Sequence, residues 1–416
     1  MEGLKAMTRR EWLMNLGLTM SIVSPQKTGA HQESQKRRLP YDFFPISYWW
    51  GPPATAERYQ ELAECNFTMT FEADIDLSHR FGMKCLVLDE RIVKAAAQPG
   101  PDWEKLVEEA VTDYRNHPAL FGYYIKDEPN ASEFPNLAKV HRRLLELDPQ
   151  SVPYINLFPT YASQEQLGTA TYEEYVDQFL QMIRPKVLSY DHYAFLEGKD
   201  RTDYFLNMEL IRLKALQVGI PFWFILLSTP AKYYRTPTEG ELRWQVYTSL
   251  AYGAKGIMYF TYWTVDYEGW GDGIIRRDGT RSERYEIVKE INREVKVLGP
   301  LLLELDSRQV YHLGGPLPDG ASSPNPDSWV QKVDGGSIVV GELVHHKGSE
   351  FLFIVNASYK EETNVAVFLK KPVASAYEVL RSPGGGEKPL PVSSLEGISL
   401  VKLSLKAGDG RLLRIV

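Results

Sequence analysis

Two kinds of segment alternate regularly between residues 43 and 300. Short apolar or aromatic runs are separated by longer segments whose apolar residues recur with the period of a helix. The runs are 43–50, 67–73, 83–89, 120–128, 152–158, 186–195, 220–228 and 255–263. Strands that alternate with helices predict a parallel sheet, and eight such units in about 250 residues predict a (β/α)₈ TIM barrel. The connection 74–82 is short for a full helix and is the weakest part of this prediction.

The segments between and after these runs predict the helices of the barrel. Their apolar residues fall on one face at helical spacing. The predicted helices are 54–65, 102–117, 132–147, 171–184, 201–217, 238–254 and 282–305.

The sequence changes character after about residue 305. Short stretches of alternating polarity are separated by clusters of Gly, Pro, Asn and Asp, which predicts a small antiparallel β-sandwich. Examples of these stretches are 337–346, 350–358 and 364–370. We therefore expect a leader and linker over 1–40, a barrel over 41–304 and a β-sandwich over 305–416.

The first 40 residues resemble a twin-arginine signal peptide with a linker. Arg9 and Arg10 precede a mildly apolar run that is too short to span a bilayer, and a polar stretch follows it. An arginine pair before a surface helix is the alternative interpretation. The resemblance predicts export of the folded protein to the periplasm or the medium. No later segment reaches about 20 apolar residues, so we expect no membrane span.

Charge and cysteine content exclude some classes of partner. The net charge of −7 argues against a nucleic-acid partner, which would require Lys and Arg clustered on one face. A neutral partner fits better. Cys65 and Cys85 are too few for a disulfide framework and are expected to be small buried residues.

Acidic residues follow several of the predicted strands. In a barrel of parallel strands, polar residues at the C-terminal strand ends face the mouth where ligands bind. The run 120–128 ends in Asp127 and Glu128, and Pro129 is expected to bias Glu128 toward an extended backbone. A helix cap or a salt-bridged pair is the structural alternative. Because adjacent carboxylates point in different directions, only one needs to be functional, and we favour Glu128.

This strand end and two longer stretches resemble a known group of enzymes. Residues 121–129, FGYYIKDEP, resemble the fourth-strand signature of the clan A glycoside hydrolases. Residues 242–264 and 273–300 resemble the end of the barrel in β-galactosidase-like members of that superfamily. The resemblance implies a (β/α)₈ barrel with a C-terminal β-sandwich, a glycosidase acting on an oligo- or polysaccharide, and Glu128 as general acid/base.

The chain departs from the pattern of those enzymes at two points. Asp127 stands where Asn is usual, and a carboxylate cannot donate a hydrogen bond to a sugar 2-hydroxyl unless it is protonated. The seventh predicted strand, 220–228, ends without the Glu that serves as nucleophile in clan A. Glycoside hydrolysis by the usual route needs two carboxyl groups. The second one must therefore come from another strand end.

Asp191, at the end of the sixth predicted strand, is our first choice for the second carboxylate. Strands four and six could place their ends opposite one another across the mouth, and the aromatic surroundings of Asp191 would exclude water. Asp191 would act as nucleophile or as base for water, and Glu72 is the next candidate. A hydroxyl ligand, or a carboxylate that orients His192, is the alternative interpretation of Asp191.

Other strand-end residues are expected to bind the sugar, whose apolar face stacks on aromatic rings while polar side chains contact its hydroxyls. The aromatic candidates are Trp49, Trp50, Tyr124, Tyr193, Trp223, Tyr262, Trp263 and Trp270. The predicted substrate-binding set is Trp50, Glu72, Asp89, Asp127, Asn156, His192, Tyr262, Trp263 and Trp270.

Other chemistries find less support in the sequence. No HxH or HExxH spacing occurs, and His345 and His346 should point to opposite faces of a strand, so we expect no metal and no other cofactor. A carbohydrate-binding barrel that has lost hydrolysis is the alternative function, because the seventh strand lacks its acid. A polysaccharide lyase would need a base such as Tyr190 or His192.

Overall fold

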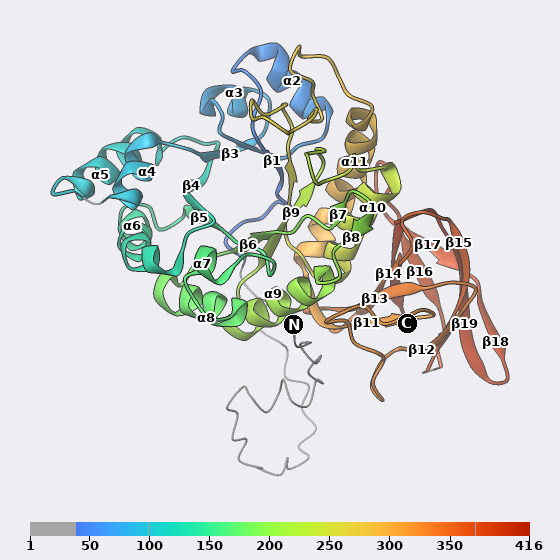
Figure 1. Cartoon of the computed structure of the whole chain (residues 1–416). Helices are drawn as coiled ribbons and strands as arrows, with labels where there is room; N and C mark the ends of the chain where they lie inside the picture. Colours follow the sequence, from blue (N-terminus) through green and yellow to red (C-terminus); the bar gives the residue numbers. More distant parts are fainter. Residues whose placement is uncertain (1–38, 99, 371) are drawn as a thin grey trace, which may run out of the picture. The chain divides into compact units, whose positions relative to one another are not determined.

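The computed structural model of the chain describes residues 39–98, 100–370 and 372–416 (Figure 1). Arg9 and Arg10, on which the predicted export signal depends, lie outside these ranges, so that signal stays a prediction. Among the helices in these ranges, none is long and apolar enough to cross a membrane.

The first part of the described chain is a barrel of parallel strands. Its strands are β1 (Ile46–Trp49), β2 (Met69–Phe71), β3 (Lys84–Val87), β4 (Leu120–Asp127), β5 (Val152–Leu157), β6 (Leu188–Asp191), β9 (Phe222–Leu227) and β10 (Ile257–Phe260). Neighbouring strands pair in parallel in the order β1-β10-β9-β6-β5-β4-β3-β2. The Thr68 amide donates to the Ile46 carbonyl at 3.0 Å and links β1 to the start of β2. Each strand lies inside one predicted run, so the predicted barrel is confirmed.

Helices connect the strands of the barrel. They are α2 (Ala56–Glu64), α3 (Ile75–Arg80), α4 (Glu90–Ala97), α5 (Trp103–Tyr114), α6 (Phe134–Leu147), α7 (Gln164–Leu167), α8 (Tyr172–Ile183), α9 (Tyr204–Val218), α10 (Glu239–Ala251) and α11 (Arg284–Leu303), with the 3₁₀ turn η1 (Ala131–Glu133) before α6. The short connection 74–82 does hold a helix, the six-residue α3. Helices α4 and α7 were not predicted. A small hairpin, β7 (Phe195–Leu196) and β8 (Lys199–Asp200), lies between β6 and α9.

Aromatic side chains fill the inside of the barrel. Trp49 packs edge-on against Phe71 with ring centroids 4.8 Å apart, and Tyr124 lies beside both rings. Trp223, the second residue of β9, is fully buried, and its Nε1 donates to the hydroxyl of Tyr41 at 2.7 Å. Tyr41 precedes β1, so Trp223 lies toward the N-terminal ends of the strands. The expectation that Trp223 is near the mouth is therefore wrong, because its ring packs inside the barrel.

The rest of the chain forms two antiparallel sheets. One contains β11 (Leu305–Leu313), β13 (Ile338–His345), β14 (Glu350–Asn356), β20 (Gly410–Ile415), β16 (Ala376–Val379) and β17 (Glu387–Leu390). The other contains β12 (Val330–Asp334), β15 (Thr363–Leu369), β19 (Ile398–Leu405) and β18 (Val392–Leu395). This confirms the predicted β-sandwich.

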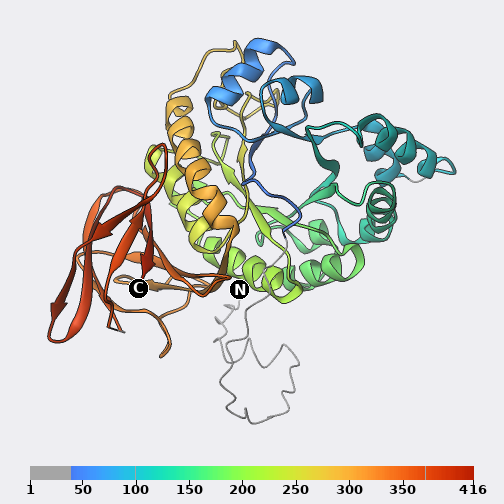
Figure 2. The same ribbon diagram turned by 180° about the vertical axis from the view of Figure 1, so that it is seen from behind.

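The central strands of the six-stranded sheet, β13, β14 and β20, are buried on both faces. In β13, Val339 and Leu343 join the core of the barrel helices, whereas Ile338 and Val340 join the core between the two sheets. This follows from the strand period, because successive side chains point to opposite faces. Figure 2 shows the sandwich, in orange and red, beside the helices that close the barrel.

A buried network of charges, which we call the junction network, joins the sandwich to the barrel. Arg243 on α10 lies 3.1 Å from Glu294 on α11. Arg381 of the sandwich lies 2.9 Å from Glu294 and 2.7 Å from Asp409. The Tyr247 hydroxyl also donates to Glu294. Because each carboxylate faces a guanidinium, these charges compensate one another in the interior.

Cys65 and Cys85 are free, fully buried thiols, as predicted. Cys65 lies in the core of the barrel helices, close to α11, where its thiol donates to the Tyr285 carbonyl at 3.9 Å.

Candidate active site at the barrel mouth

Four carboxyl groups interact at the C-terminal ends of β2, β4 and β6, and we call them the acid cluster. Its members are Glu72, Asp127, Glu128 and Asp191. The carboxyl groups of Glu128 and Asp191 share a hydrogen bond, and the charge of Asp127 acts on each of the other three. Asp191 is 4% exposed, and the other three are half-buried. The structure thus brings together the two residues predicted as the carboxylate pair.

The backbone at this edge of the barrel is unusual. Trp50, Glu72 and Glu128 follow β1, β2 and β4 and have φ values of 57°, 52° and 43°. A positive φ costs a non-glycine residue of the order of 1 kcal/mol, and such conformations gather at functional sites. The expectation that Pro129 keeps Glu128 extended is wrong. The Glu128 amide instead donates to the Asn156 carbonyl at 2.9 Å while its side chain reaches Asp191.

Burial and mutual repulsion change the acidity of the cluster. Burial raises the pKa of both Glu128 and Asp191, and the charges of Asp191 and Asp127 raise the pKa of Glu128 further. Because two like charges in contact are unfavourable in a buried site, the pair holds a shared proton. Burial raises the pKa of Asp127 to about 6. Burial and the charge of Asp127 raise the pKa of Glu72 to about 7.

Asn156, near the end of β5, lies between two of these acids. Its Nδ2 donates to Asp127 Oδ1 at 3.1 Å and to Asp191 Oδ1 at 3.0 Å. Its Oδ1 accepts a hydrogen bond from Ser189 Oγ at 3.0 Å, and the side chain is 1% exposed. We predicted Asn156 as a ligand of a sugar hydroxyl. That prediction is wrong in this structure because both ends of the amide bind protein groups.

His192 is also too deeply buried for its predicted role. The ring is fully buried, with Tyr161 and Tyr204 edge-on to it. Its Nε2 lies 3.2 Å from Asp203 Oδ1, so Asp203, and not Asp191, orients this ring. Although burial raises the pKa of Asp203, bonds with His192 and Thr160 lower it to about 2. A contact between His192 and a sugar is therefore excluded in this conformation.

An aromatic wall stands beside the acid cluster. It consists of Tyr193, Tyr234, Phe260 and Trp270, with neighbouring ring centroids 4.9 to 6.3 Å apart. Tyr161, whose hydroxyl bonds to Tyr234, feels the charge of Asp191 and connects the wall to the acids. The wall contains the predicted Trp270. Sequence reasoning missed Tyr234 because it lies in a loop without periodicity.

Trp50 and Trp263 lie together on the β1 side of the mouth. The Trp263 amide donates to the Trp50 carbonyl at 2.9 Å, and both side chains are half-buried. The Trp50 ring meets Tyr267 edge-on at 5.3 Å. The guanidinium of Arg58 lies 5.2 Å from the centroid of Trp263. Their predicted role in sugar binding stays a prediction.

Two predicted sugar ligands have structural roles instead. Tyr262 is fully buried against Tyr48 and Phe67, because β10 ends at Phe260 and the chain then turns into the core. Asp89 caps α4: its Oδ1 accepts from the amide of Arg91, and the Arg91 guanidinium binds both its oxygens at 2.8 and 3.0 Å. Both predictions are therefore wrong.

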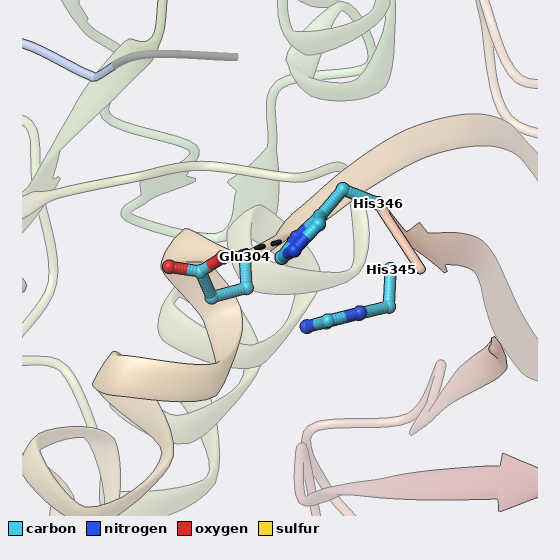
Figure 3. A group of neighbouring side chains, drawn as sticks. All are labelled: Glu304, His345 and His346. Atoms are coloured by element: carbon cyan, nitrogen blue, oxygen red, sulfur yellow. Dashed lines mark ion pairs between the residues drawn. The ribbon is translucent and has the colours of Figure 1, made fainter. Parts of the chain in front are cut away.

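A second group of titratable side chains lies where α11 ends. Glu304, His345 and His346 place one ligand atom each within 4.8 Å of the others (Figure 3). The two rings are tilted by 33° with centroids 4.1 Å apart. The expectation of opposite faces is wrong because β13 ends at His345. The Lys347 amide donates to His345 Nδ1 at 3.1 Å, so the proton of the neutral ring lies on Nε2. A metal ion binds an unprotonated ring nitrogen, and that of His345 already accepts this hydrogen bond.

Comparison with known proteins identifies a related family over part of the chain. A glycoside hydrolase family model described as beta-galactosidase matches residues 156–298, about a third of the chain. This match covers β6 with Asp191, the aromatic wall and most of α11. It confirms the resemblance to β-galactosidase-like glycoside hydrolases. No curated protein sequence matches the chain.

Solved structures share the fold at low sequence identity. A glycoside hydrolase family 5 protein from Bacteroides vulgatus is 10% identical with a TM-score of 0.54, over 90% of this chain and 89% of that one. A cycloisomaltooligosaccharide glucanotransferase from Paenibacillus is 7% identical with a TM-score of 0.54, over 90% and 85%. A β-galactosidase from Marinomonas is 12% identical with a TM-score of 0.49, and the match covers 63% of this chain but 62% of that one. The family match supports a glycosidase, and the solved structures show the shared fold.

Proposed function

We propose that this protein hydrolyses O-glycosidic bonds with Glu128 as general acid/base and Asp191 as nucleophile. The observation that carries the proposal is the hydrogen-bonded pair of carboxyl groups at the mouth of a glycosidase-like barrel. The missing acid at the end of β9 is then replaced by Asp191, which β6 supplies two residues before Tyr193 of the aromatic wall.

The mutual hydrogen bond of the pair fits retention of configuration better than inversion. Carboxyl groups about 5–5.5 Å apart act by a covalent route, whereas a gap of about 6.5–9.5 Å admits the water that inversion needs. Two carboxyl groups within hydrogen-bonding reach of each other are closer than the gap that inversion requires. This favours Asp191 as nucleophile over Asp191 as base for water.

The reaction then proceeds in two steps. Asp191, in its ionised form, attacks the anomeric carbon while Glu128 gives its proton to the leaving oxygen, so that the glycosidic bond breaks and a glycosyl ester forms. Glu128, now ionised, takes a proton from a water molecule that attacks the same carbon. The ester breaks, Asp191 leaves as carboxylate, and both residues return to their starting protonation states.

The same geometry weighs against the alternative, a barrel that only binds carbohydrate. Such a protein needs no second carboxyl group near Glu128. Two buried acids in contact raise the pKa of each other and destabilise the folded state. A protein that only binds carbohydrate gains nothing from such a pair. We also retain export through the twin-arginine signal as a proposal, since Arg9 and Arg10 are placed as such a signal requires.

A screen of aryl glycosides and polysaccharides with wild-type enzyme and Glu128→Gln tests the proposed function. We expect turnover of at least one neutral glycoside by the wild type and a large loss in the variant. Binding of a sugar without turnover by the wild type would favour the non-catalytic barrel. For the export proposal, Arg9→Lys with Arg10→Lys should keep the precursor in the cytoplasm, and normal secretion of this variant would contradict it.

A further inference from the structure

The hydrogen bonds of Asn156 point to a role that differs from sugar binding. The register of the sheet places Asp127 beside Asn156 and Asn156 beside Ser189, in one row across β4, β5 and β6. Asp191 is two residues beyond Ser189 and therefore lies on the same face of its strand. The row brings the Asn156 amide between the two carboxylates without any loop.

A second set of bonds fixes the orientation of this amide. Ser189 Oγ donates to Asn156 Oδ1, and the Tyr154 hydroxyl shares a hydrogen bond of 2.8 Å with Ser189 Oγ. Tyr154, Asn156 and Ser189 are each at most 1% exposed. Because its oxygen is held by Ser189, the amide must present its two N–H groups to the acids, and it cannot turn to present its oxygen.

The Asn156 amide donates a hydrogen bond to only one member of the carboxyl pair, Asp191. This bond favours the ionised form of that group. Burial and the charges of the surrounding acids raise the pKa of Glu128, and its hydrogen bond to Asp191 raises that pKa further. The donor therefore helps to decide which of the two carboxyl groups holds the shared proton.

We propose that Asn156 is a positioning residue that keeps Asp191 as the charged member of the pair, and that Ser189 and Tyr154 lock its amide for this purpose. The proposal rests on the roles given above to Glu128 and Asp191. It assigns the proton of the pair to Glu128 through a named hydrogen bond. Asn156 itself makes no contact with substrate.

The pH dependence of turnover separates this role from substrate binding. Removing the donor should raise the pH at which Asp191 ionises, so the acidic limb of the kcat profile should move to higher pH. In Asn156→Ala we expect a shift of about one pH unit, a fall in kcat of about tenfold or more at pH 6, and a KM within about threefold of wild type. An unshifted limb with a strongly raised KM would overturn the proposal and make Asn156 a sugar ligand.

Ser189 supplies a milder variant and its control. Ser189→Ala leaves the amide in place but frees its orientation, so we expect a smaller shift in the same direction. Ser189→Thr keeps the hydroxyl donor and should show a smaller shift than Ser189→Ala. If Asn156→Ala does not fold, the comparison of Ser189→Ala with Ser189→Thr decides, and equal profiles of the two would contradict the locking role.

A titration that does not depend on activity separates this proposal from the proposed function. In protein labelled with ¹³C at the Asp carboxyl carbons, the Asp191 signal is identified by its loss in Asp191→Asn. We expect its apparent pKa to be higher in Ser189→Ala than in wild type, whether or not a substrate is found. An unchanged titration would overturn the positioning role, while a shifted titration in a protein without glycosidase activity would contradict only the proposed function.

Discussion

The acid cluster and the junction network are two buried groups of charges in one chain, and they differ in sign pattern. In the junction network, Glu294 and Asp409 face Arg243 and Arg381 at 2.7 to 3.1 Å, with one longer contact of 3.6 Å. In the acid cluster, the charged neighbours that shift the pKa of Glu72, Glu128 and Asp191 are other acids, whereas Lys126 lowers the pKa of Asp127.

This difference separates charges that hold a fold together from charges that serve a reaction. An ion pair is costly to bury. Removing one partner nevertheless destabilises the protein strongly, because the other charge is left buried and unpaired. Like charges held together destabilise the folded state and give acids that keep protons at neutral pH. Substitutions should therefore have opposite effects on stability in the two regions, and only those in the acid cluster should remove activity.

The largest effect is expected from Asp191→Ala, which should abolish turnover and leave the fold intact. Removing one of several buried like charges offsets the loss of the hydrogen bond from Asn156, so the melting temperature should change little. Added azide should restore part of the activity and yield a glycosyl azide of inverted configuration, as expected when a nucleophile is replaced. Retention of more than about a tenth of wild-type activity, a loss below about 1.4 kcal/mol, would reject Asp191 and make Glu72 the next candidate.

The second effect is that of Glu128→Gln on substrates that differ in leaving group. Turnover of glycosides with poor leaving groups should fall by about 10²-fold or more, with a smaller loss for activated aryl glycosides, because a basic leaving oxygen needs the proton most. Steady-state kinetics on two aglycones measures this. Equal losses on both would contradict the acid role.

The third effect concerns stability and compares the two regions directly. Arg381→Leu leaves Glu294 and Asp409 with one guanidinium fewer and should lower the free energy of unfolding by about 3–5 kcal/mol. Asp127→Asn removes one of several like charges and should leave the stability unchanged or raise it. Denaturant unfolding of both variants at pH 7.5 checks this. A loss of stability in Asp127→Asn as large as that in Arg381→Leu would remove the distinction between the regions.

The fold was predictable because it follows from local sequence patterns. Apolar runs bounded by helical segments located all eight strands, and the rule that strand ends face the mouth made Glu128 and Asp191 candidates. The tertiary contacts of side chains were not predictable in this way. The register of three strands decides that both ends of the Asn156 amide bind protein groups. The end of β10 at Phe260 decides that Tyr262 turns into the core.

Features that arise where an element ends were also missed. The positive φ of Glu128 follows from a hydrogen bond to β5 that no rule for residues before proline includes. His345 and His346 lie together because the strand stops between them. Asp203, which orients His192, lies eleven residues after it and carries no motif. Each of these depends on distant partners or on the exact end of an element, which periodicity does not determine.

The smallest effect expected is a pH-dependent change in stability from Glu72. Its pKa is raised to about 7 in the folded protein, above the value of about 4.3 in an unfolded chain. Between these two values the folded state holds a proton that the unfolded state has lost, so this group lowers stability as pH rises through the window. Glu72→Gln should therefore melt higher than wild type at pH 7.5 and close to wild type at pH 4.5. A difference in melting temperature that stays constant from pH 4.5 to pH 7.5 would show that Glu72 is not held in its protonated form by the acid cluster.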